Sequence, residues 1–295
     1  MPTRLKRPQM VKFSERYGHV PVRSALQIDG IDDGLRNRLW NLICITFFPS
    51  IPDFRGIADD YLEMHKGAEL VFEDLWHDYF KWTIDSIGTS YIAALSKLKE
   101  YFFGCKWYEV YDLLEFLAGS DRTVVGQAFM DSVNSILKEE QSGYRFVSGR
   151  IVQITSEEEI AAIEQALALP DSLKPVREHL GQSLALLSNR KTPDYRNSIK
   201  ESISAIESLS KIVSGLPKAT LGPALNAVEK KAKLHAVLKE AFQKLYGYTS
   251  DAHGIRHALM EEPTLDVEDA KFMLVSCSAF VNYLVVKAQK AGITI

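Results

Sequence analysis

The densest group of polar side chains in the sequence lies between residues 246 and 257. It reads YGYTSDAHGIRH and holds two of the seven histidines. The apolar periodicity of the preceding stretch stops here, just before the longest apolar stripe of the chain, which predicts a connection between two helices. Loops held on a scaffold of helices often present functional side chains to a cleft. The candidate site residues are Tyr248, Asp251, His253, Arg256 and His257.

These residue types suit proton transfer beside a phosphate group. An imidazole titrates near neutral pH, so His257 is a candidate acid or base and His253 a second proton carrier. The guanidinium of Arg256 can hold a phosphate and stabilise the charge that develops on it. Asp251 or Tyr248 would orient these groups. The combination matches metal-independent RNA cleavage, in which a ribose 2′-hydroxyl attacks the adjacent phosphorus.

Two other interpretations of this cluster stay open on residue types alone. One is a structural connection between helices, in which Ser250 or Asp251 caps a short helix. The other is a metal site, because His253 and His257 lie four residues apart and Asp251 or Glu261 would supply a third ligand. A glycine inside that turn, and the lack of a glutamate beside the first histidine, argue against a zinc hydrolase. We therefore expect no bound metal.

No motif in the sequence points to nucleotide hydrolysis or acyl transfer. The chain has no phosphate loop ending in Gly-Lys-Ser/Thr, no dinucleotide fingerprint of three spaced glycines and no nucleophile elbow. We therefore expect no cofactor.

The charge balance limits any contact with nucleic acid. Net charge is −3; residues 1–150 carry 18 basic and 21 acidic side chains, and the rest of the chain carries 17 of each. A long groove for nucleic acid needs a surplus of Lys and Arg, so contact with RNA should be small and local. Local basic groups occur at Arg36-Asn37-Arg38 with Arg23, and at Arg196-Asn197. Solvated helix faces and helix starts are the simpler explanation, and phosphate contacts are the alternative.

Cysteine usage and hydropathy predict a cytoplasmic protein. Cys44, Cys105 and Cys277 are far apart among apolar residues, which favours neither a disulfide framework nor a cysteine-based zinc site. Residues 1–13 are basic but lack the apolar core of a secretion signal. The apolar stretch 272–286 would reach about 22 Å as a helix, short of a roughly 30 Å hydrocarbon layer. We therefore expect a buried helix and no membrane contact.

Apolar residues three and four positions apart recur along the chain and predict a mainly α fold. We expect two helical domains, residues 1–155 and 156–295, with one small β-hairpin between them. The hairpin is predicted within residues 143–154, where the pattern alternates around Ser148-Gly149. All four tryptophans fall in the first domain and are expected to pack in its core. Its predicted helices cover residues 35–48, 70–87, 91–103, 107–117 and 123–139.

The second domain is predicted to be a bundle of about five helices after an opening helix that follows the hairpin. Thr155, Asp194 and Asp266 have the residue types and spacing of helix N-caps. Gly215 is typical of the residue that ends a helix. The predicted helices of the bundle cover 171–187, 194–215, 221–228, 234–245 and 266–290.

Several segments carry a family resemblance. In the second half they are DYRNSIKESISAIE at 194–207, LYGYTS at 245–250, GIRHA at 254–258 and CSAFVNYL at 277–284. In the first half they are FSERYG at 13–18 and LRNRLWN at 35–41. The first set resembles the C-terminal domain of AbiJ-like proteins, a HEPN-related helical domain of bacterial phage-defence loci. The second set resembles an N-terminal domain type attached to it, and the matches span most of the chain.

This resemblance implies a helical bundle that often dimerises, with ribonuclease activity in many relatives that halts a phage-infected cell. The family's catalytic signature is an arginine followed, after four to six residues, by a histidine, and no pair in this chain fits. Arg256 and His257 are adjacent instead, so the catalytic pair is not carried over.

Two functions therefore remain as expectations. The first is an anti-phage abortive-infection ribonuclease that acts on cellular RNA. The second is a non-catalytic dimeric sensor or adaptor that binds a phage protein or a partner from a defence system. We expect a homodimer in either case, because the helix predicted around residues 273–286 has apolar residues on more than one face.

Overall fold

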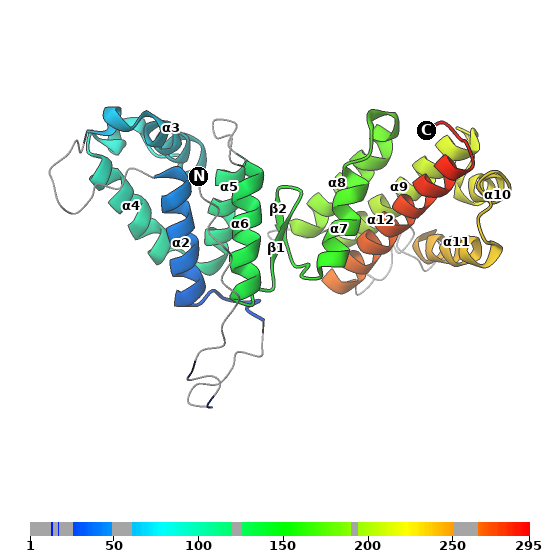
Figure 1. Cartoon of the computed structure of the whole chain (residues 1–295), viewed down its shortest axis with the longest axis horizontal. Coiled ribbons are helices and arrows are strands. Elements are labelled where there is room, and N and C mark those ends of the chain that lie inside the picture. The colour runs from blue at the N-terminus through cyan, green and yellow to red at the C-terminus, as the bar shows by residue number, and fades with distance from the viewer. Residues whose placement is uncertain are drawn as a thin grey trace, which may run out of the picture. The chain divides into compact units, whose positions relative to one another are not determined.

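The computed structural model describes residues 13, 17, 26–48, 61–119, 126–189, 194–250 and 265–295 (Figure 1). The chain divides into two compact units, Met1–Ile151 and Val152–Ile295. Both are built from helices, and the sheet found among the described residues is one two-stranded hairpin. The mainly α fold with a small hairpin, expected from the sequence, is confirmed.

In the first unit, five α-helices of the described residues surround a core rich in aromatic rings. They are α2 (Asp33–Phe47), α3 (Lys66–Asp74), α4 (Tyr91–Gly104), α5 (Trp107–Ala118) and α6 (Gly126–Glu139). A short 3-10 helix, Leu62–His65, precedes α3. Phe72 stacks on Phe48 with ring centroids 4.7 Å apart and meets Trp76 edge to face at 5.9 Å. All three rings are fully buried, so large aromatic surfaces hold these helices together.

The expectation of one helix over residues 70–87 is wrong. Helix α3 continues as a π-helical turn, Leu75–Phe80, which ends at Lys81 in the left-handed conformation with φ of 59°. A separate 3-10 helix, Ile84–Ile87, follows. The break lets Trp82 stack on Phe80 with centroids 4.2 Å apart and leaves Trp82 43% exposed, so this tryptophan is not a core residue.

The predicted hairpin consists of β1 (Arg145–Val147) and β2 (Arg150–Val152). Its turn residues Ser148 and Gly149 both have positive φ, 46° and 83°, as a tight two-residue hairpin turn requires. Asn134 of α6 anchors it, since its amide oxygen accepts from the Phe146 N–H at 2.7 Å and its amide nitrogen donates to the Phe146 carbonyl at 3.0 Å. The hairpin is thereby fixed against α6.

The second unit contains a bundle in which α9 occupies the centre. Its helices are α7 (Glu157–Leu167), α8 (Lys174–Ser188), α9 (Tyr195–Ser214), α10 (Leu221–Ala232), α11 (Ala236–Ser250) and α12 (Val267–Lys290). A 3-10 turn, Asp171–Leu173, leads into α8. Helix α9 packs against α8, α10 and α12 through a buried aliphatic surface.

The residues that cap or end the helices of this unit are those predicted from the sequence, with one exception. Asp194 and Asp266 cap α9 and α12 through their side chains, and Gly215 ends α9 with φ of 71°. For α7 the capping residue is Ser156 and not Thr155, because the Ser156 side chain accepts the hydrogen bond from the backbone three residues later. Position 159 is also a glutamate, so the capping spacing fits either start.

Helix α12 is long and apolar enough, by length and composition, to cross a membrane. Half of its most apolar window is buried inside the protein, where α12 packs against α7 and α9. Cys277, on this buried face, is a free thiol, as are Cys44 and Cys105. The packing of the bundle therefore accounts for much of the apolar character of α12.

Candidate functional site

The polar cluster chosen from the sequence lies at the end of α11 and beyond it. Tyr248 belongs to α11, whose helical backbone continues through Ser250, so the prediction that helical structure stops at Tyr246 is wrong for these residues. The side chain of Tyr248 is not described. The candidates that lie outside the described residues altogether are Asp251, His253, Arg256 and His257, together with the possible metal ligand Glu261.

Two side-chain contacts position the helix that carries Tyr248. The ring of Phe242 on α11 stacks on Phe280 of α12 with centroids 3.5 Å apart. Lys239 on α11 pairs with Glu229 of α10, with Nζ 2.7 Å from Oε2. An aromatic stack with α12 and an ion pair with α10 therefore hold α11 in the bundle.

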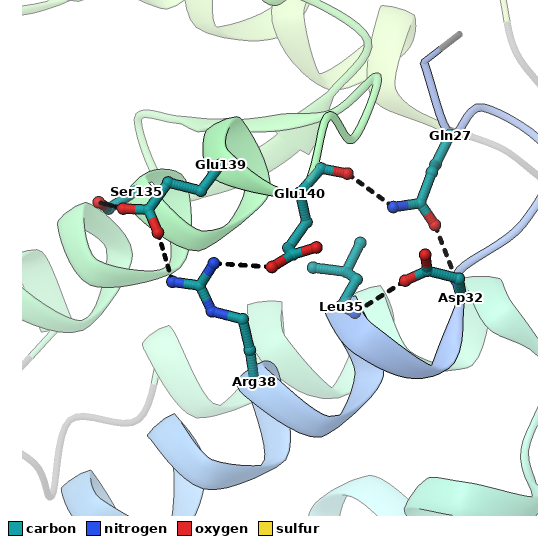
Figure 2. A network of polar contacts seen from close by, with 7 residues as sticks. All are labelled: Gln27, Asp32, Leu35, Arg38, Ser135, Glu139 and Glu140. Carbon is teal, nitrogen blue, oxygen red and sulfur yellow. Dashed lines mark hydrogen bonds and ion pairs between the residues drawn. The ribbon is translucent and has the colours of Figure 1, made fainter. Parts of the chain in front are cut away.

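The basic group at Arg36 and Arg38 serves the architecture of the first unit. Arg38 on α2 reaches two consecutive carboxylates at the end of α6, Glu139 at 2.5 Å and Glu140 at 2.8 Å (Figure 2). Burial lowers the pKa of Arg38, but the hydrogen bonds to Glu140 and Glu139 outweigh it and leave that pKa above its ordinary value. Arg36 donates to the backbone carbonyls of Phe102 and Cys105, at 2.6 and 3.2 Å. These guanidinium groups are engaged within the protein.

Gln27 extends the same network across the start of α2. Its amide nitrogen donates to the Glu140 carbonyl and its amide oxygen accepts from the Asp32 N–H, both at 2.7 Å (Figure 2). Asp32 in turn accepts from the Leu35 N–H at 2.8 Å and caps α2. The Gln27 backbone also bonds to Gln141 at 2.8 Å. Residues far apart in sequence are thus locked together at the end of α6.

The second basic group, Arg196-Asn197, lies at the start of α9. Asp194 accepts from the Asn197 N–H at 2.9 Å and from the Asn197 side-chain amide at 2.7 Å. For Asn197 the helix-start interpretation therefore holds.

A polar pair that sequence reasoning missed joins α8 and α9. The Nδ1 atom of His179 lies 2.6 Å from Oε2 of Glu201, and the two side chains are 35% and 22% exposed. The residues are 22 positions apart, so no local motif links them. A signal was present in the spacing: His179 and Ser183 lie four apart on one face of α8, and Ser198 and Glu201 lie three apart on α9.

Behind this pair runs a group of three buried serines, which we call the serine seam: Ser183, Ser198 and Ser202. The Ser183 hydroxyl lies 2.7 Å from that of Ser202 and 3.1 Å from that of Ser198. Ser198 also donates to the Ser183 carbonyl at 2.9 Å, across the helix interface. Small side chains allow the helices to approach closely, and each hydroxyl has a partner, so the seam joins α8 to α9 with its polar groups satisfied.

Metal-binding chemistry finds no support within the described ranges. No group of three His, Cys, Asp or Glu side chains able to hold a metal ion occurs among them. The proposed ligands Asp251, His253, His257 and Glu261 lie in the remaining part of the chain.

Comparison with known proteins gives one family. Neither a curated protein nor a solved structure matches the chain. The family model described as AbiJ N-terminal domain 4 matches residues 11–169, a range that contains α2 to α7 and the hairpin. Since this match covers more than half of the 295 residues, the chain belongs to the AbiJ N-terminal domain 4 family.

Proposed function

We propose that this chain is an anti-phage abortive-infection protein whose C-terminal unit is HEPN-like and cleaves cellular RNA without a metal. The observation that carries the proposal is the match to AbiJ N-terminal domain 4 over residues 11–169, since AbiJ proteins belong to abortive-infection systems. The helical second unit and the resemblance of residues 194–207 and 245–258 to AbiJ-type C-terminal domains support the rest. The first unit would sense infection or regulate the second.

The chemistry assigned to the C-terminal cluster needs no added reagent. A base removes the proton from a ribose 2′-hydroxyl, O2′ attacks the adjacent phosphorus, and the 5′-oxygen leaves with a proton from an acid. The products are a 2′,3′-cyclic phosphate and a 5′-hydroxyl end. His257 and His253 are the proton carriers, Arg256 holds the phosphate, and Asp251 or Tyr248 orients them.

The alternative function is a non-catalytic dimeric sensor or adaptor that binds a phage protein or another defence protein. The observation that favours it is the adjacency of Arg256 and His257, which departs from the spaced arginine and histidine of catalytic relatives. In this case the cluster would contribute to recognition and not to bond cleavage.

Self-association through α12 is part of both proposals. Phe272, Tyr283 and Val286 are 58%, 37% and 42% exposed and share one face of this helix. The same patch on two copies can pair about a two-fold axis. Light scattering should therefore give the mass of a dimer at micromolar concentration, and Tyr283→Asp should reduce it to that of a monomer. A wild-type protein that is monomeric throughout this range would exclude the dimer.

The decisive experiment for the function is cleavage of total RNA and of tRNA by purified protein, prepared from uninfected and from phage-infected cells. We expect fragments with 2′,3′-cyclic phosphate ends, equal yields with and without a chelator, and no cleavage by His257→Ala or Arg256→Ala. His77→Ala is the control, since His77 lies in the first unit, where its exposed side chain pairs with its neighbour Asp78. Intact RNA in both preparations would exclude the nuclease and leave the adaptor.

A further inference from the structure

The lysines of the second half of the chain are gathered in one part of it. Residues 151–295 carry 17 basic and 17 acidic side chains, so this half is neutral overall. Residues 207–244, which run from the last turns of α9 through α10 into α11, hold seven lysines and three glutamates, with no Asp or Arg. Positive charge is therefore concentrated where α9, α10 and α11 pack together, at the end of the second unit away from α7 (Figure 1).

Three of these seven lysines have a glutamate beside them. Nζ of Lys211 lies 2.7 Å from Oε1 of Glu207. Nζ of Lys239 lies 2.7 Å from Oε2 of Glu229. The third glutamate, Glu240, is followed by a lysine four residues later, one turn along α11. The four lysines that remain, which we call the lysine cluster, are Lys218, Lys230, Lys231 and Lys233, and all four are exposed.

The lysine cluster lies where the ends of α9 and α10 meet. Nζ of Lys231 donates to the carbonyl of Ser214, the last residue of α9, at 2.5 Å. An ammonium group has three donors, so Lys231 keeps two for other groups. Two members of the cluster are its close neighbours in sequence, and Lys218 follows Ser214 by four residues, a path of at most about 14 Å. The four positive charges are thus held near one another.

One member of the cluster occupies a backbone position that favours glycine. Lys233 ends α10 in the left-handed conformation, with φ of 51° and ψ of 46°. The matching position at the end of α9 holds Gly215, with φ of 71°. A residue with a Cβ atom pays a steric cost in this conformation, so lysine is not the residue that stability alone would select here. Backbone strain of this kind is typical of positions whose side chain has a function.

We propose that the lysine cluster is a contact surface for the phosphate backbone of a nucleic acid. Among the ion pairs that join described residues, none neutralises these four ammonium groups. Cations placed close together on an otherwise neutral unit attract a polyanion locally and displace the counterions condensed on its phosphates. The cluster is small, as the charge balance of the sequence requires. This inference goes beyond the proposed function, because binding of the backbone does not require that the unit cleave it.

The test measures binding of a labelled single-stranded oligonucleotide to the full-length protein by fluorescence anisotropy at several salt concentrations. The probe is 2′-O-methyl RNA, which cannot be cleaved through its 2′-oxygen. If the cluster neutralises four phosphates, the logarithm of the binding constant should fall with that of the salt concentration with a slope of about −3. Lys230→Gln combined with Lys233→Gly should weaken binding by about 10-fold or more and halve that slope. Glycine removes the strain at position 233, so the melting temperature should not fall.

Lys174→Gln combined with Lys290→Gln is the matched control. It removes the same charge from exposed positions of the second unit outside residues 207–244, so it should bind like the wild type. DNA of the same sequence distinguishes the two sources of backbone: equal affinity supports a contact with phosphates alone, and tighter binding of the RNA probe identifies RNA as the ligand. Equal losses in the two double variants would overturn the proposal. Binding of anionic phospholipid vesicles without binding of either oligonucleotide would also overturn it.

Cleavage of unmodified RNA by the same proteins separates this inference from the proposed function. If the wild type cleaves RNA while loss of the two lysines leaves probe binding unchanged, the lysine cluster is not the contact surface and the nuclease stands. If the wild type binds the probe through the cluster and cleaves no RNA, the contact surface stands and the nuclease is excluded. A wild-type protein that binds neither oligonucleotide would overturn the contact surface.

Discussion

The two units bury different kinds of side chain. In the described part of Met1–Ile151 the core contains eleven buried aromatic residues, whereas the described part of Val152–Ile295 buries one, Phe280. The described part of the second unit instead buries six serines, three of them in the seam between α8 and α9. Large aromatic rings fill the core of the first unit, whereas small side chains let the helices of the second unit approach closely.

The two units also differ in how their charged and titratable side chains are used. In the first unit Arg36 and Arg38 contact groups 66 to 102 residues away in sequence, and these contacts join separate helices. In the second unit His179 and Glu201 also join two helices, but the imidazole keeps an exposed side. The charged residues of the first unit therefore join helices through inward contacts, whereas the contact between His179 and Glu201 lies at the surface of the second unit.

The largest loss of stability is expected when a buried ring is removed from the first unit. Trp76→Ala should lower the free energy of unfolding of that unit by about 3–5 kcal/mol, the usual cost of truncating a buried aromatic residue. Trp76 is fully buried, and its Nε1 also donates to Ser86 at 3.0 Å. Urea unfolding followed by tryptophan fluorescence is the measurement, because all four tryptophans lie in the first unit.

Trp82→Ala is the matched control. Trp82 is 43% exposed, so its loss should cost clearly less than that of Trp76. Equal losses in the two variants would show that the aromatic cluster around the π-helical turn does not divide into core and surface as the structure indicates.

The corresponding change in the second unit is to enlarge a serine of the seam. Ser183→Val should destabilise the unit by about 1–3 kcal/mol, because two methyl groups must fit in place of a hydroxyl that lies 2.7 and 3.1 Å from its neighbours Ser202 and Ser198. Circular dichroism during urea unfolding measures the effect. Ser204→Val on α9 is the control, since the Ser204 hydroxyl donates to the Lys200 carbonyl of its own helix and is more exposed. If Ser183→Val lowers the free energy of unfolding no more than Ser204→Val does, the interface between α8 and α9 is not tightly packed at this position.

A smaller effect is expected from the ion pairs of the first unit. Arg38→Ala should cost about 1 kcal/mol, because the Arg38 side chain is 38% exposed and solvent screens both carboxylates. The cost should shrink in 1 M salt, where the screening length falls to about 3 Å. Arg177→Ala is the control: its partner Asp171 is 94% exposed, so its loss should be close to zero. An Arg38 effect that does not change with salt would contradict an electrostatic origin.

Much of the fold followed from local chemistry in the sequence. The boundaries of α2, α4, α5 and α12 lie within two residues of those predicted, because apolar spacing and capping residues act over a few positions. The hairpin followed from Ser148-Gly149, a pair suited to positive φ. The π-helical turn at Leu75–Phe80 was missed, since Trp76 and Phe80 lie four residues apart, which is also the spacing of a regular α-helix.

The polar contacts were much less predictable. Arg38 looked like part of a basic patch because its partners Glu139 and Glu140 lie about 100 residues further along the chain, and only the fold brings them together. The pair of His179 and Glu201 was missed for the same reason. Residues 251–257 stood out by composition, and their roles stay predictions.

The buried thiols give an effect close in size to that of Arg38 and a probe of each unit. Burial raises the pKa of Cys44 from 9.0 to about 11, with Lys99 opposing the shift, and burial also raises the pKa of Cys277. Because the folded state holds the proton more tightly, the stabilisation is complete below pH 9 and is lost as pH rises toward 11. Between pH 8 and pH 10 the wild type should therefore lose somewhat more than about 1 kcal/mol through Cys44.

Cys44→Ala should remove that part of the alkaline loss from the first unit and leave the second unit unchanged. Urea unfolding at pH 8 and pH 10, followed by tryptophan fluorescence for the first unit and by circular dichroism for both, measures the difference. Cys277→Ala is the reciprocal variant, and it should act on the second unit alone. Identical alkaline losses in the wild type and in Cys44→Ala would mean that this thiol already ionises as freely in the folded first unit as in the unfolded chain.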